Sequence, residues 1–339
     1  MNKTTVISQI GCGYWGPNLL RAFSSFPDVH VKWVAEMSDA RRRFVASQFP
    51  KSTTTESIDE ILNDSEVAAV VIASPAETHA DLAVRCLEAG KHVFVEKPLA
   101  TTLEDVERIA TASRVAGKIV MAGHTFLFNP AVRYVKELLD RGELGEIYYI
   151  YSQRLNLGQV RTDVNAWWNL APHDISILQY WLNDLAPSEV SASGASYLRS
   201  GIEDIVFANL KWSSGVVGHI HVSWLDPQKV RKITIVGSKK MLIYDDAADS
   251  KITILDRGYD KIPEIGERMD FDQPNPTALA QRSGDILMPS IQWKEPLKTE
   301  AEHFIECITQ GREPITGIDH ARKVVEILLK ADRSMKYNG

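Results

Sequence analysis

The sequence has few cysteines, no dense run of positive charge and no long apolar segment. Its three cysteines, Cys12, Cys86 and Cys307, lie far apart, which argues against a disulfide framework or a Cys-x-x-Cys metal site. A net charge of −6 argues against a non-specific nucleic-acid surface. No segment is apolar over the length that crosses a bilayer, and no signal peptide is evident at the N-terminus. We therefore expect a cytoplasmic protein with no nucleic-acid partner, no membrane partner and no bound metal.

The length of the chain bounds its domain organisation. At 339 residues it is too long for one compact core, and 44% hydrophobic with 24% charged residues is typical of a globular protein. We expect two domains, residues 1–123 and 124–339, with the C-terminal helices able to pack back on the first domain.

A glycine-rich segment follows the first β-like run, residues 4–10, and is itself followed by a helical pattern; it reads Gly11-Cys12-Gly13-Tyr14-Trp15-Gly16. Strand, G-x-G-x-x-G and helix in this order predict a dinucleotide site, where backbone approaches a pyrophosphate at a helix N-terminus. The next strand, residues 29–35, ends in Glu36, whose carboxylate accepts ribose hydroxyls and repels a 2′-phosphate. NAD is thus favoured over NADP, although Arg41 and Arg42 leave open a pairing with such a phosphate.

Strand-like and helix-like patterns alternate five times in the first half. The run 67–73 is apolar on both faces, as in a parallel sheet, and Ser74-Pro75 ends it. A helix carrying His79 follows, and then the strand 92–95, a helix 103–116 capped by Thr101 or Thr102, and the strand 119–122. This alternation predicts a doubly wound parallel sheet of the Rossmann type. His79 is either a cofactor or substrate contact or a histidine on the helix surface.

The strand 92–95 stops abruptly at Glu96-Lys97-Pro98. The carboxyl ends of strands in an open parallel sheet face the ligand crevice. A lysine there, partly desolvated beside a nicotinamide ring, is expected to have a lowered pKa and to exchange protons near neutrality. The alternative is an ordinary surface ion pair at a strand end.

The second half has a different pattern. Long β-like runs at 146–153, 190–195, 205–212, 215–224, 232–236, 240–244 and 251–255 predict an α+β domain with a large, mostly antiparallel sheet. An uncovered sheet face would favour a homodimer or homotetramer. The polar segment 153–174 is a candidate binding loop, and Pro172 predicts a helix beginning there, with His173 at its start. Residues 256–296 are expected to be a surface excursion, and helices 299–309 and 319–334 to close the chain.

In order and spacing these motifs resemble the Gfo/Idh/MocA family of NAD(P)-dependent sugar and polyol oxidoreductases. The resemblance covers nearly the whole chain and rests on the glycine loop, Ser74-Pro75-x-x-x-His79, Ala89-Gly90-Lys91-His92-Val93, Glu96-Lys97-Pro98 and Gly123-His124-x-Phe126-x-Phe128-Asn129-Pro130. It implies that Lys97 lies by the nicotinamide and the reacting hydroxyl, that the bond before Pro98 is often cis, and that His173 takes the hydroxyl proton. The family usually has an aspartate four residues before that histidine, whereas this chain has Asn169.

The resemblance thus implies an NAD-dependent dehydrogenase that oxidises a secondary ring hydroxyl of a sugar. The sequence looks most like members acting on nucleotide sugars, similar to UDP-N-acetylglucosamine 3-dehydrogenase. A free polyol or sugar, such as an inositol, and a non-catalytic dinucleotide-binding regulator are the alternatives. The predicted catalytic residues are Lys97, His173 and Asn169. The predicted cofactor contacts are Gly11, Gly13, Tyr14, Trp15, Gly16, Glu36, Ser74, Pro75, His79, Glu96 and Lys97. The predicted substrate contacts are Arg154, Asn156, Arg161, Asp163, Asn165, Asn169 and His173.

Overall fold

The chain divides into two compact units, each with its own sheet. A computed structural model describes residues 4–263 and 277–337. The first unit comprises Met1–Pro130, Pro172–Asp184 and Trp293–Arg333, and the second comprises Ala131–Ala171, Leu185–Gln292 and Ser334–Gly339.

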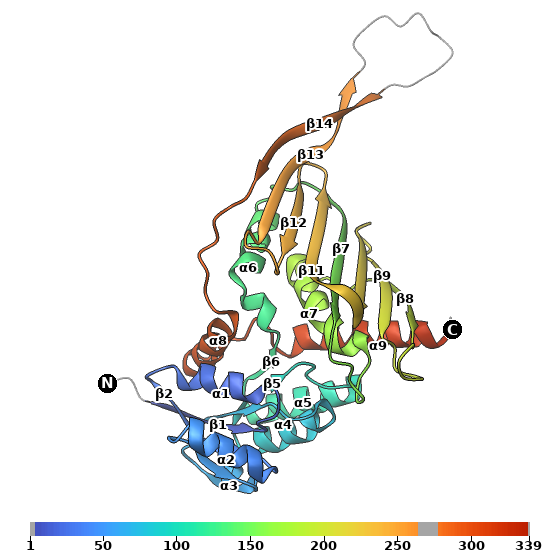
Figure 1. The fold of residues 1–339 in the computed structure, drawn as a ribbon. Helices are drawn as coiled ribbons and strands as arrows, with labels where there is room; N and C mark the ends of the chain where they lie inside the picture. The colour runs from blue at the N-terminus through green and yellow to red at the C-terminus, as the bar shows by residue number, and fades with distance from the viewer. Residues whose placement is uncertain (1–3, 264–276, 338–339) are drawn as a thin grey trace, which may run out of the picture. The chain divides into compact units, whose positions relative to one another are not determined.

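The first unit contains a six-stranded parallel sheet in the order β3-β2-β1-β4-β5-β6 (Figure 1). Its strands are β1 (Thr5–Ile10), β2 (Val29–Ala35), β3 (Thr53–Thr55), β4 (Ala69–Ile72), β5 (His92–Glu96) and β6 (Val120–Gly123). Every residue of β4 is buried, as expected for a central parallel strand covered on both faces. The doubly wound sheet predicted from the alternating pattern is confirmed, and its order reverses between β1 and β4.

Helices cover both faces of this sheet. They are α1 (Gly16–Ser24), α2 (Asp39–Gln48), α3 (Asp59–Asn63), α4 (His79–Glu88), α5 (Leu103–Ala116), α8 (Pro296–Gln310) and α9 (Ile318–Tyr337), with the 3-10 turns η1 (Ala76–Thr78) and η2 (Thr125–Phe128). α1 packs against α8, and α4 packs against α5 (Figure 1). Thr102 caps α5 as predicted, because its hydroxyl accepts a hydrogen bond of 3.0 Å from the N–H of Asp105.

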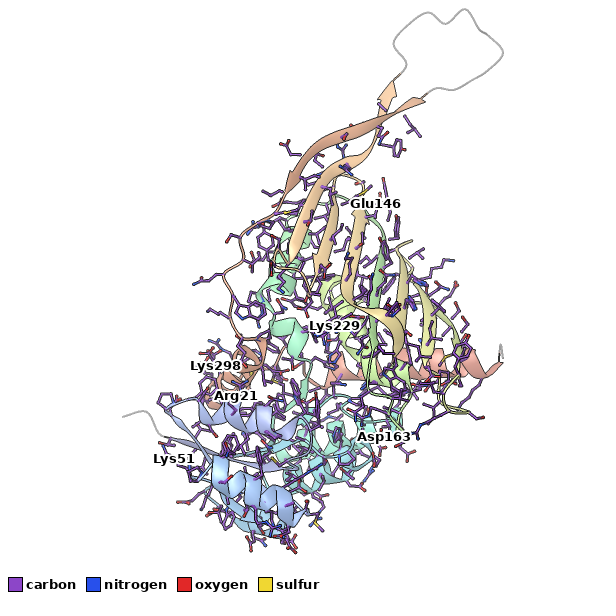
Figure 2. All side chains as sticks on the ribbon, viewed as in Figure 1. Arg21, Lys51, Glu146, Asp163, Lys229 and Lys298 are labelled. Atoms are coloured by element: carbon purple, nitrogen blue, oxygen red, sulfur yellow. The ribbon has the colours of Figure 1, made fainter. Side chains whose placement is uncertain are left out.

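Three phenylalanines join α1, β5 and α8 into one core. The ring centroids of Phe23 and Phe94 are 5.9 Å apart, those of Phe23 and Phe304 6.2 Å, and those of Phe94 and Phe304 5.7 Å, all edge to face. At the start of α8, Arg21 of α1 donates to the carboxylate of Glu295; Arg21 and Lys298 are labelled in Figure 2. Helix α8 is thereby fixed against α1 and the parallel sheet.

The second unit contains an eight-stranded sheet in the order β14-β13-β12-β11-β7-β10-β9-β8 (Figure 1). Its strands are β7 (Ile147–Leu157), β8 (Glu189–Ala195), β9 (Ile205–Lys211), β10 (Val217–Ser223), β11 (Leu225–Gly237), β12 (Met241–Asp245), β13 (Ile252–Pro263) and β14 (Thr277–Leu287). Among the described pairings of this second sheet, only that of β10 with β7 is parallel. The predicted mostly antiparallel sheet is confirmed, and α6 (Pro130–Asp140) precedes it.

The segment 256–296, expected to be a surface excursion, contains two paired strands that the sequence did not predict. β13 extends to Pro263 and pairs with β14; residues 264–276 lie outside the described residues. Most side chains from Gln281 to Leu287 are exposed. A strand with neither face buried needs no alternation of apolar and polar residues, so its sequence carried no strand pattern.

No helix in the described part of the chain is long and apolar enough to cross a membrane.

Candidate active site

The glycine-rich turn begins where β1 ends and needs its glycines for steric reasons. Gly11 has φ +87°, and a Cβ on it would lie 2.7 Å from the carbonyl oxygen of Ala73. A Cβ on Gly16 would lie 2.9 Å from the carbonyl oxygen of Gly11. The buried Gln9 fixes the turn, since its Nε2 donates to the carbonyl oxygens of Gly11 (2.9 Å) and Gly16 (3.0 Å). Sequence reasoning missed Gln9, although its side chain holds both ends of the motif.

The N-terminus of α1 suits an anion. Trp15 is its N-cap residue and makes no capping hydrogen bond through its side chain. In the first turn Pro17 has no N–H, and the N–H of Asn18 donates to the carbonyl oxygen of Trp15 at 2.9 Å. The remaining first-turn N–H groups together with the helix dipole favour a phosphate group at such a place. Tyr14 is 89% exposed and Trp15 is 40% exposed, so both are accessible at the turn. The geometry therefore fits the pyrophosphate of a dinucleotide.

Glu36 follows β2 and is held rigidly. Its Oε2 accepts from the backbone N–H of Cys12 at 2.7 Å, and its Oε1 accepts from the backbone N–H of Ser38 at 2.9 Å. The carboxylate is thus fixed against the glycine-rich turn, at the position that recognises a ribose in dinucleotide-binding folds.

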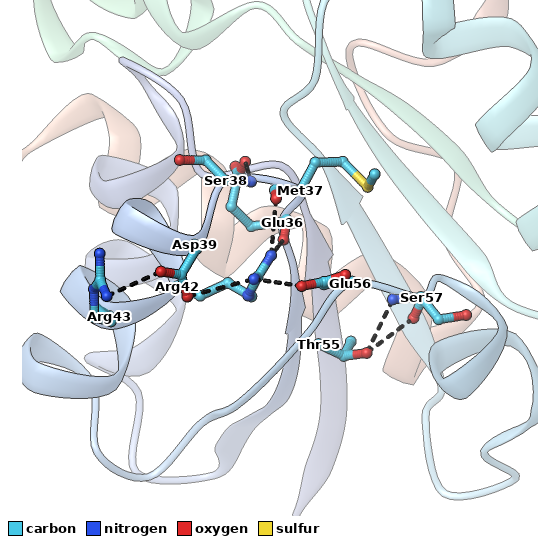
Figure 3. Close-up of polar contacts among 9 residues, drawn as sticks. All are labelled: Glu36, Met37, Ser38, Asp39, Arg42, Arg43, Thr55, Glu56 and Ser57. Atoms are coloured by element: carbon cyan, nitrogen blue, oxygen red, sulfur yellow. Dashed lines mark hydrogen bonds and ion pairs between the residues drawn. The ribbon is translucent and has the colours of Figure 1, made fainter.

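Arg42 is engaged by protein groups around Glu36 (Figure 3). Its Nη1 donates to the carbonyl oxygens of Glu36 and Met37, both at 2.8 Å, and its Nη2 pairs with Glu56 at 2.5 Å. The guanidinium is therefore neutralised. Arg41 lies beside the glycine-rich turn instead: its Nη1 is 3.3 Å from the place that a Cβ on Gly13 would take. A fixed Glu36 carboxylate beside a neutralised Arg42 fits a 2′-hydroxyl better than a 2′-phosphate.

His79 lies inside the protein, so of the two alternatives for it the helix-surface histidine is wrong. It is 1% exposed; its Nδ1 contacts the carbonyl oxygen of Pro98 at 2.8 Å and its Nε2 that of Ser74 at 3.0 Å. Burial lowers the pKa of His79, although both carbonyl contacts act in the opposite direction. The ring joins the Ser74-Pro75 turn to the Lys97-Pro98 segment. A direct contact of His79, Ser74 or Pro75 with the cofactor stays a prediction.

Glu96 and Lys97 lie at the carboxyl end of β5, and the Lys97–Pro98 peptide bond is cis, as the resemblance implied. Both side chains are half-buried. Burial raises the pKa of Glu96 to about 7, while the charge of Lys97, the N–H of Lys97 and the indole of Trp15 act in the opposite direction. Glu96 is therefore poised between its two protonation states near neutral pH.

His173 lies in the middle of a helix, so its predicted place at a helix start is wrong. α7 spans Ala166–Trp181 with Pro172 in its interior. The helix begins earlier because Asn165 caps it, its Oδ1 accepting from the N–H of Trp168 at 3.0 Å. Proline removes one backbone hydrogen bond, but the buried faces on either side hold the helix together. His173 is therefore not at a helix N-terminus, where the helix dipole would favour its neutral form.

The ring of His173 stands edge-on to Phe126 of η2, with 4.9 Å between the ring centroids. η2 follows β6, and β6 neighbours β5, the strand that ends at Glu96 just before Lys97. The structure thus brings Lys97 and His173 into one compact unit at the same edge of the parallel sheet. The other substrate-site predictions fall in the second unit.

Asn169 lies one turn before His173 on α7 and is oriented by Trp224. The buried indole Nε1 of Trp224 donates to Asn169 Oδ1 at 3.1 Å. Sequence reasoning missed Trp224, because nothing local connects it with α7. With its oxygen engaged by Trp224, the amide of Asn169 has a defined orientation.

The remaining candidate substrate residues lie on β7 or on the loop before α7. Arg154 is buried and Asn156 is half-buried on β7. Arg161 Nε donates to Asp163 Oδ1 at 2.8 Å, and Asp163 has a lowered pKa chiefly through this hydrogen bond. Asn165 Nδ2 donates to Glu203 Oε2 at 2.7 Å. The expected long polar loop is shorter than predicted, because β7 continues to Leu157.

A parallel sheet in this strand order, with a glycine-rich turn after β1 and a fixed carboxylate after β2, defines a dinucleotide-binding domain. Residues 7–124 match the profile of the oxidoreductase family with an NAD-binding Rossmann fold, and residues 132–243 match the C-terminal domain of the same family. The chain therefore belongs to the Gfo/Idh/MocA family of oxidoreductases, and its cofactor domain is of the NAD-binding type.

Similar proteins act on several kinds of substrate. The chain is 25% identical to 4-carboxy-2-hydroxymuconate-6-semialdehyde dehydrogenase from Sphingobium sp., over 98% of this chain and 99% of that protein. It is 24% identical to scyllo-inositol 2-dehydrogenase (NAD(+)) from Bacillus subtilis, over 95% of this chain and 90% of that protein. The structure of UDP-N-acetylglucosamine 3-dehydrogenase from Acidithiobacillus ferrooxidans shares the fold, with a TM-score of 0.80, 20% identity and 98% of each chain covered.

Proposed function

We propose that this protein is an NAD-dependent dehydrogenase that oxidises a secondary ring hydroxyl of a sugar to a ketone. The observation that carries the proposal is the placement of Lys97 and His173 in one unit, at the sheet edge where the glycine-rich turn and Glu36 form a dinucleotide site. Two groups able to exchange protons beside a nicotinamide site are what alcohol oxidation requires.

The residues of this chain then have separate tasks. Bound NAD supplies the acceptor for the hydride of the carbinol carbon. Lys97 and His173 share removal of the hydroxyl proton, and the amide of Asn169, oriented by Trp224, positions the hydroxyl by hydrogen bonding. An asparagine cannot hold negative charge, so the proton has to be taken by Lys97 or His173.

The substrate we propose is a nucleotide sugar of the UDP-N-acetylhexosamine type, oxidised at C3. Arg154 and Arg161 are the side chains of the predicted substrate segment suited to a diphosphate. Arg161 is paired with Asp163, so it would exchange one anionic partner for another. A free polyol is the second candidate, because the inositol dehydrogenase of B. subtilis matches over most of its length.

The test is a panel assay with purified protein, NAD or NADP, and UDP-sugars, free sugars or inositols. Absorbance of the reduced nicotinamide is the readout, after a check for cofactor that copurifies. We expect reduction of NAD with one UDP-sugar and competitive inhibition by UDP. Turnover of a free sugar or inositol with no inhibition by UDP would favour the polyol assignment instead.

Lys97→Ala is the decisive variant in this assay. We expect a loss of turnover of at least about 100-fold, the size of a general-base contribution, with NAD binding retained. Lys51→Ala, on the surface between α2 and β3, is the matched control and should leave turnover unchanged (Figure 2). Turnover within a few-fold of wild type for Lys97→Ala would refute the role of Lys97.

We also propose that the second unit's sheet mediates homodimer or homotetramer formation. One face of the sheet is buried, while the opposite face exposes more than a third of each of four large side chains on adjacent strands: Tyr149, Tyr151, Phe207 and Val217. A monomeric mass by light scattering at micromolar concentration would count heavily against this interface.

A further inference from the structure

Two carboxyl groups of the first unit interact electrostatically: Glu96 of the Glu-Lys-Pro segment and Glu300 of α8. Glu300 is fully buried, and the Oε1 atom of Glu96 is enclosed as well. Nothing in the local sequence connects them, because Glu300 lies near the C-terminus. Their proximity is a consequence of packing within the first unit.

The aromatic core packs the two elements that carry these side chains against each other. Phe94 and Glu96 point to the same face of β5, because side chains in a strand alternate. Glu300 and Phe304 lie one turn apart on the same face of α8. The rings of Phe94 and Phe304 are in contact, with 5.7 Å between centroids, so β5 and α8 pack together at the faces that carry Glu96 and Glu300.

The β6–η2 segment provides room and one hydrogen bond for this pair. Gly123 is the β6 partner of Glu96, and a Cβ there would lie 3.1 Å from Glu96 Oε1. Two residues later, the hydroxyl of Thr125 donates to Glu300 Oε2 at 2.7 Å. Within residues 4–263 and 277–337, Oε1 of Glu96 and Oε1 of Glu300 have no hydrogen-bond donor.

Negative charge on both Glu96 and Glu300 would be energetically unfavourable, because burial removes water and like charges repel. Burial is the main cause that raises the pKa of Glu300 well above its ordinary value, and the charge of Glu96 is the second cause. Glu96, in contrast, is stabilised as a carboxylate by the charge of Lys97 and by a hydrogen bond from the indole of Trp15 in the glycine-rich turn. Glu96 therefore ionises first, and Glu300 keeps its proton.

We propose that Glu300 is a positioning residue for Lys97: as a neutral carboxylic acid it donates a hydrogen bond to Glu96 and thereby keeps Glu96 as the carboxylate beside Lys97. One proton between the two Oε1 atoms satisfies both. No bond to substrate is involved, and the net charge of the pair is −1. The inference deepens the proposed function and rests on its assignment of Lys97.

The first test is thermal unfolding of the whole protein against pH, which needs no substrate. A proton held in the folded state and released in the unfolded state makes wild type lose stability as pH rises above about 4.5. Glu300→Gln lacks this proton, so we expect its Tm to gain on wild type by about 2 °C for each pH unit between 5 and 8. The control Glu302→Gln, exposed on α8, should show no such slope.

The second test is the pH dependence of kcat/KM for oxidation. Glu300→Gln keeps a neutral donor of the same shape, so its acid limb should coincide with that of wild type. Glu300→Leu removes the donor, so Glu96 stays protonated to higher pH. Because less negative charge then lies beside Lys97, the ammonium form of Lys97 is less stable. Its acid limb should move down by about half a pH unit or more, and that of Glu96→Gln further in the same direction.

Two results would overturn the inference: a Tm difference for Glu300→Gln that is constant with pH, or acid limbs of Glu300→Gln and Glu300→Leu displaced equally. The melting test stands even if Glu300→Leu fails to fold. It also separates the two proposals, because a sloping Tm difference together with an active Lys97→Ala enzyme would refute the proposed role of Lys97 and support the carboxyl pair.

Discussion

Cofactor selection at Glu36 can be tested without knowing the substrate. The perturbation is Glu36→Gln, which keeps the size of the side chain and removes its charge. In the native structure both carboxylate oxygens accept backbone N–H groups, from Cys12 and Ser38. The glutamine amide offers one acceptor and one donor, so one of these N–H groups faces another N–H and loses its partner.

The magnitude follows from the hydrogen bonds. A hydrogen bond from a ribose hydroxyl of NAD to a charged acceptor contributes about 1.5–3 kcal/mol, and one to a neutral acceptor about 0.5–1.5 kcal/mol. A difference of about 1.4 kcal/mol is tenfold in affinity, so we expect the Kd for NAD to rise about tenfold to 100-fold. The Kd for NADP should fall about tenfold, because the charge facing its 2′-phosphate is gone. The preference for NAD thus falls by at least about 100-fold.

Isothermal titration calorimetry of the protein with each dinucleotide measures both constants. Glu60→Gln is the control, since it removes one exposed carboxylate from α3 in the same unit. An affinity of Glu36→Gln for NAD within threefold of wild type, with no gain for NADP, would refute our reasoning about this carboxylate.

Three further outcomes follow from single contacts. Trp224→Phe removes the indole donor to Asn169 and should lower kcat/KM about tenfold with NAD affinity unchanged, while Trp212→Phe, which loses a hydrogen bond to the carbonyl oxygen of Leu185, should leave kcat/KM near wild type. Thr102→Ala removes the cap of α5 and should cost about 1 kcal/mol of stability, seen as a lower Tm than that of Thr101→Ala. The hydrogen bond from Lys32 is the largest cause that lowers the pKa of Asp64 to about 2. The loss of Tm caused by Asp64→Asn should therefore be largest above pH 4 and shrink as pH falls to 2. A loss of Tm that is unchanged at pH 2 would contradict this.

Sequence patterns were informative wherever a structure is set by neighbouring residues. The glycines of the turn after β1, the cap Thr102 and the apolar run of β4 each depend on contacts within a few residues or on burial of a whole strand. The alternation of these patterns predicted the doubly wound sheet, and the Glu96-Lys97-Pro98 segment was correctly expected at a strand end.

Local rules failed where distant contacts override them. Pro172 suggested a helix start, but Asn165 caps the helix earlier and buried side chains hold it through the proline. His79 looked as if it could be a surface residue, although its ring binds the carbonyl oxygen of Pro98 from another strand end.

The sequence by itself determined the NAD-binding sheet and the antiparallel second sheet, because these depend on periodicity and on short motifs, and the resemblance of those motifs to a known family supplied the candidate proton-transfer residues. Only the tertiary structure decided what surrounds those residues. Trp224 reaches Asn169 from the second sheet, and α8 brings Glu300 to the hydroxyl of Thr125 after β6. Such contacts join segments far apart in the chain, and burial then sets the protonation of the groups that meet, so neither is encoded in any local pattern.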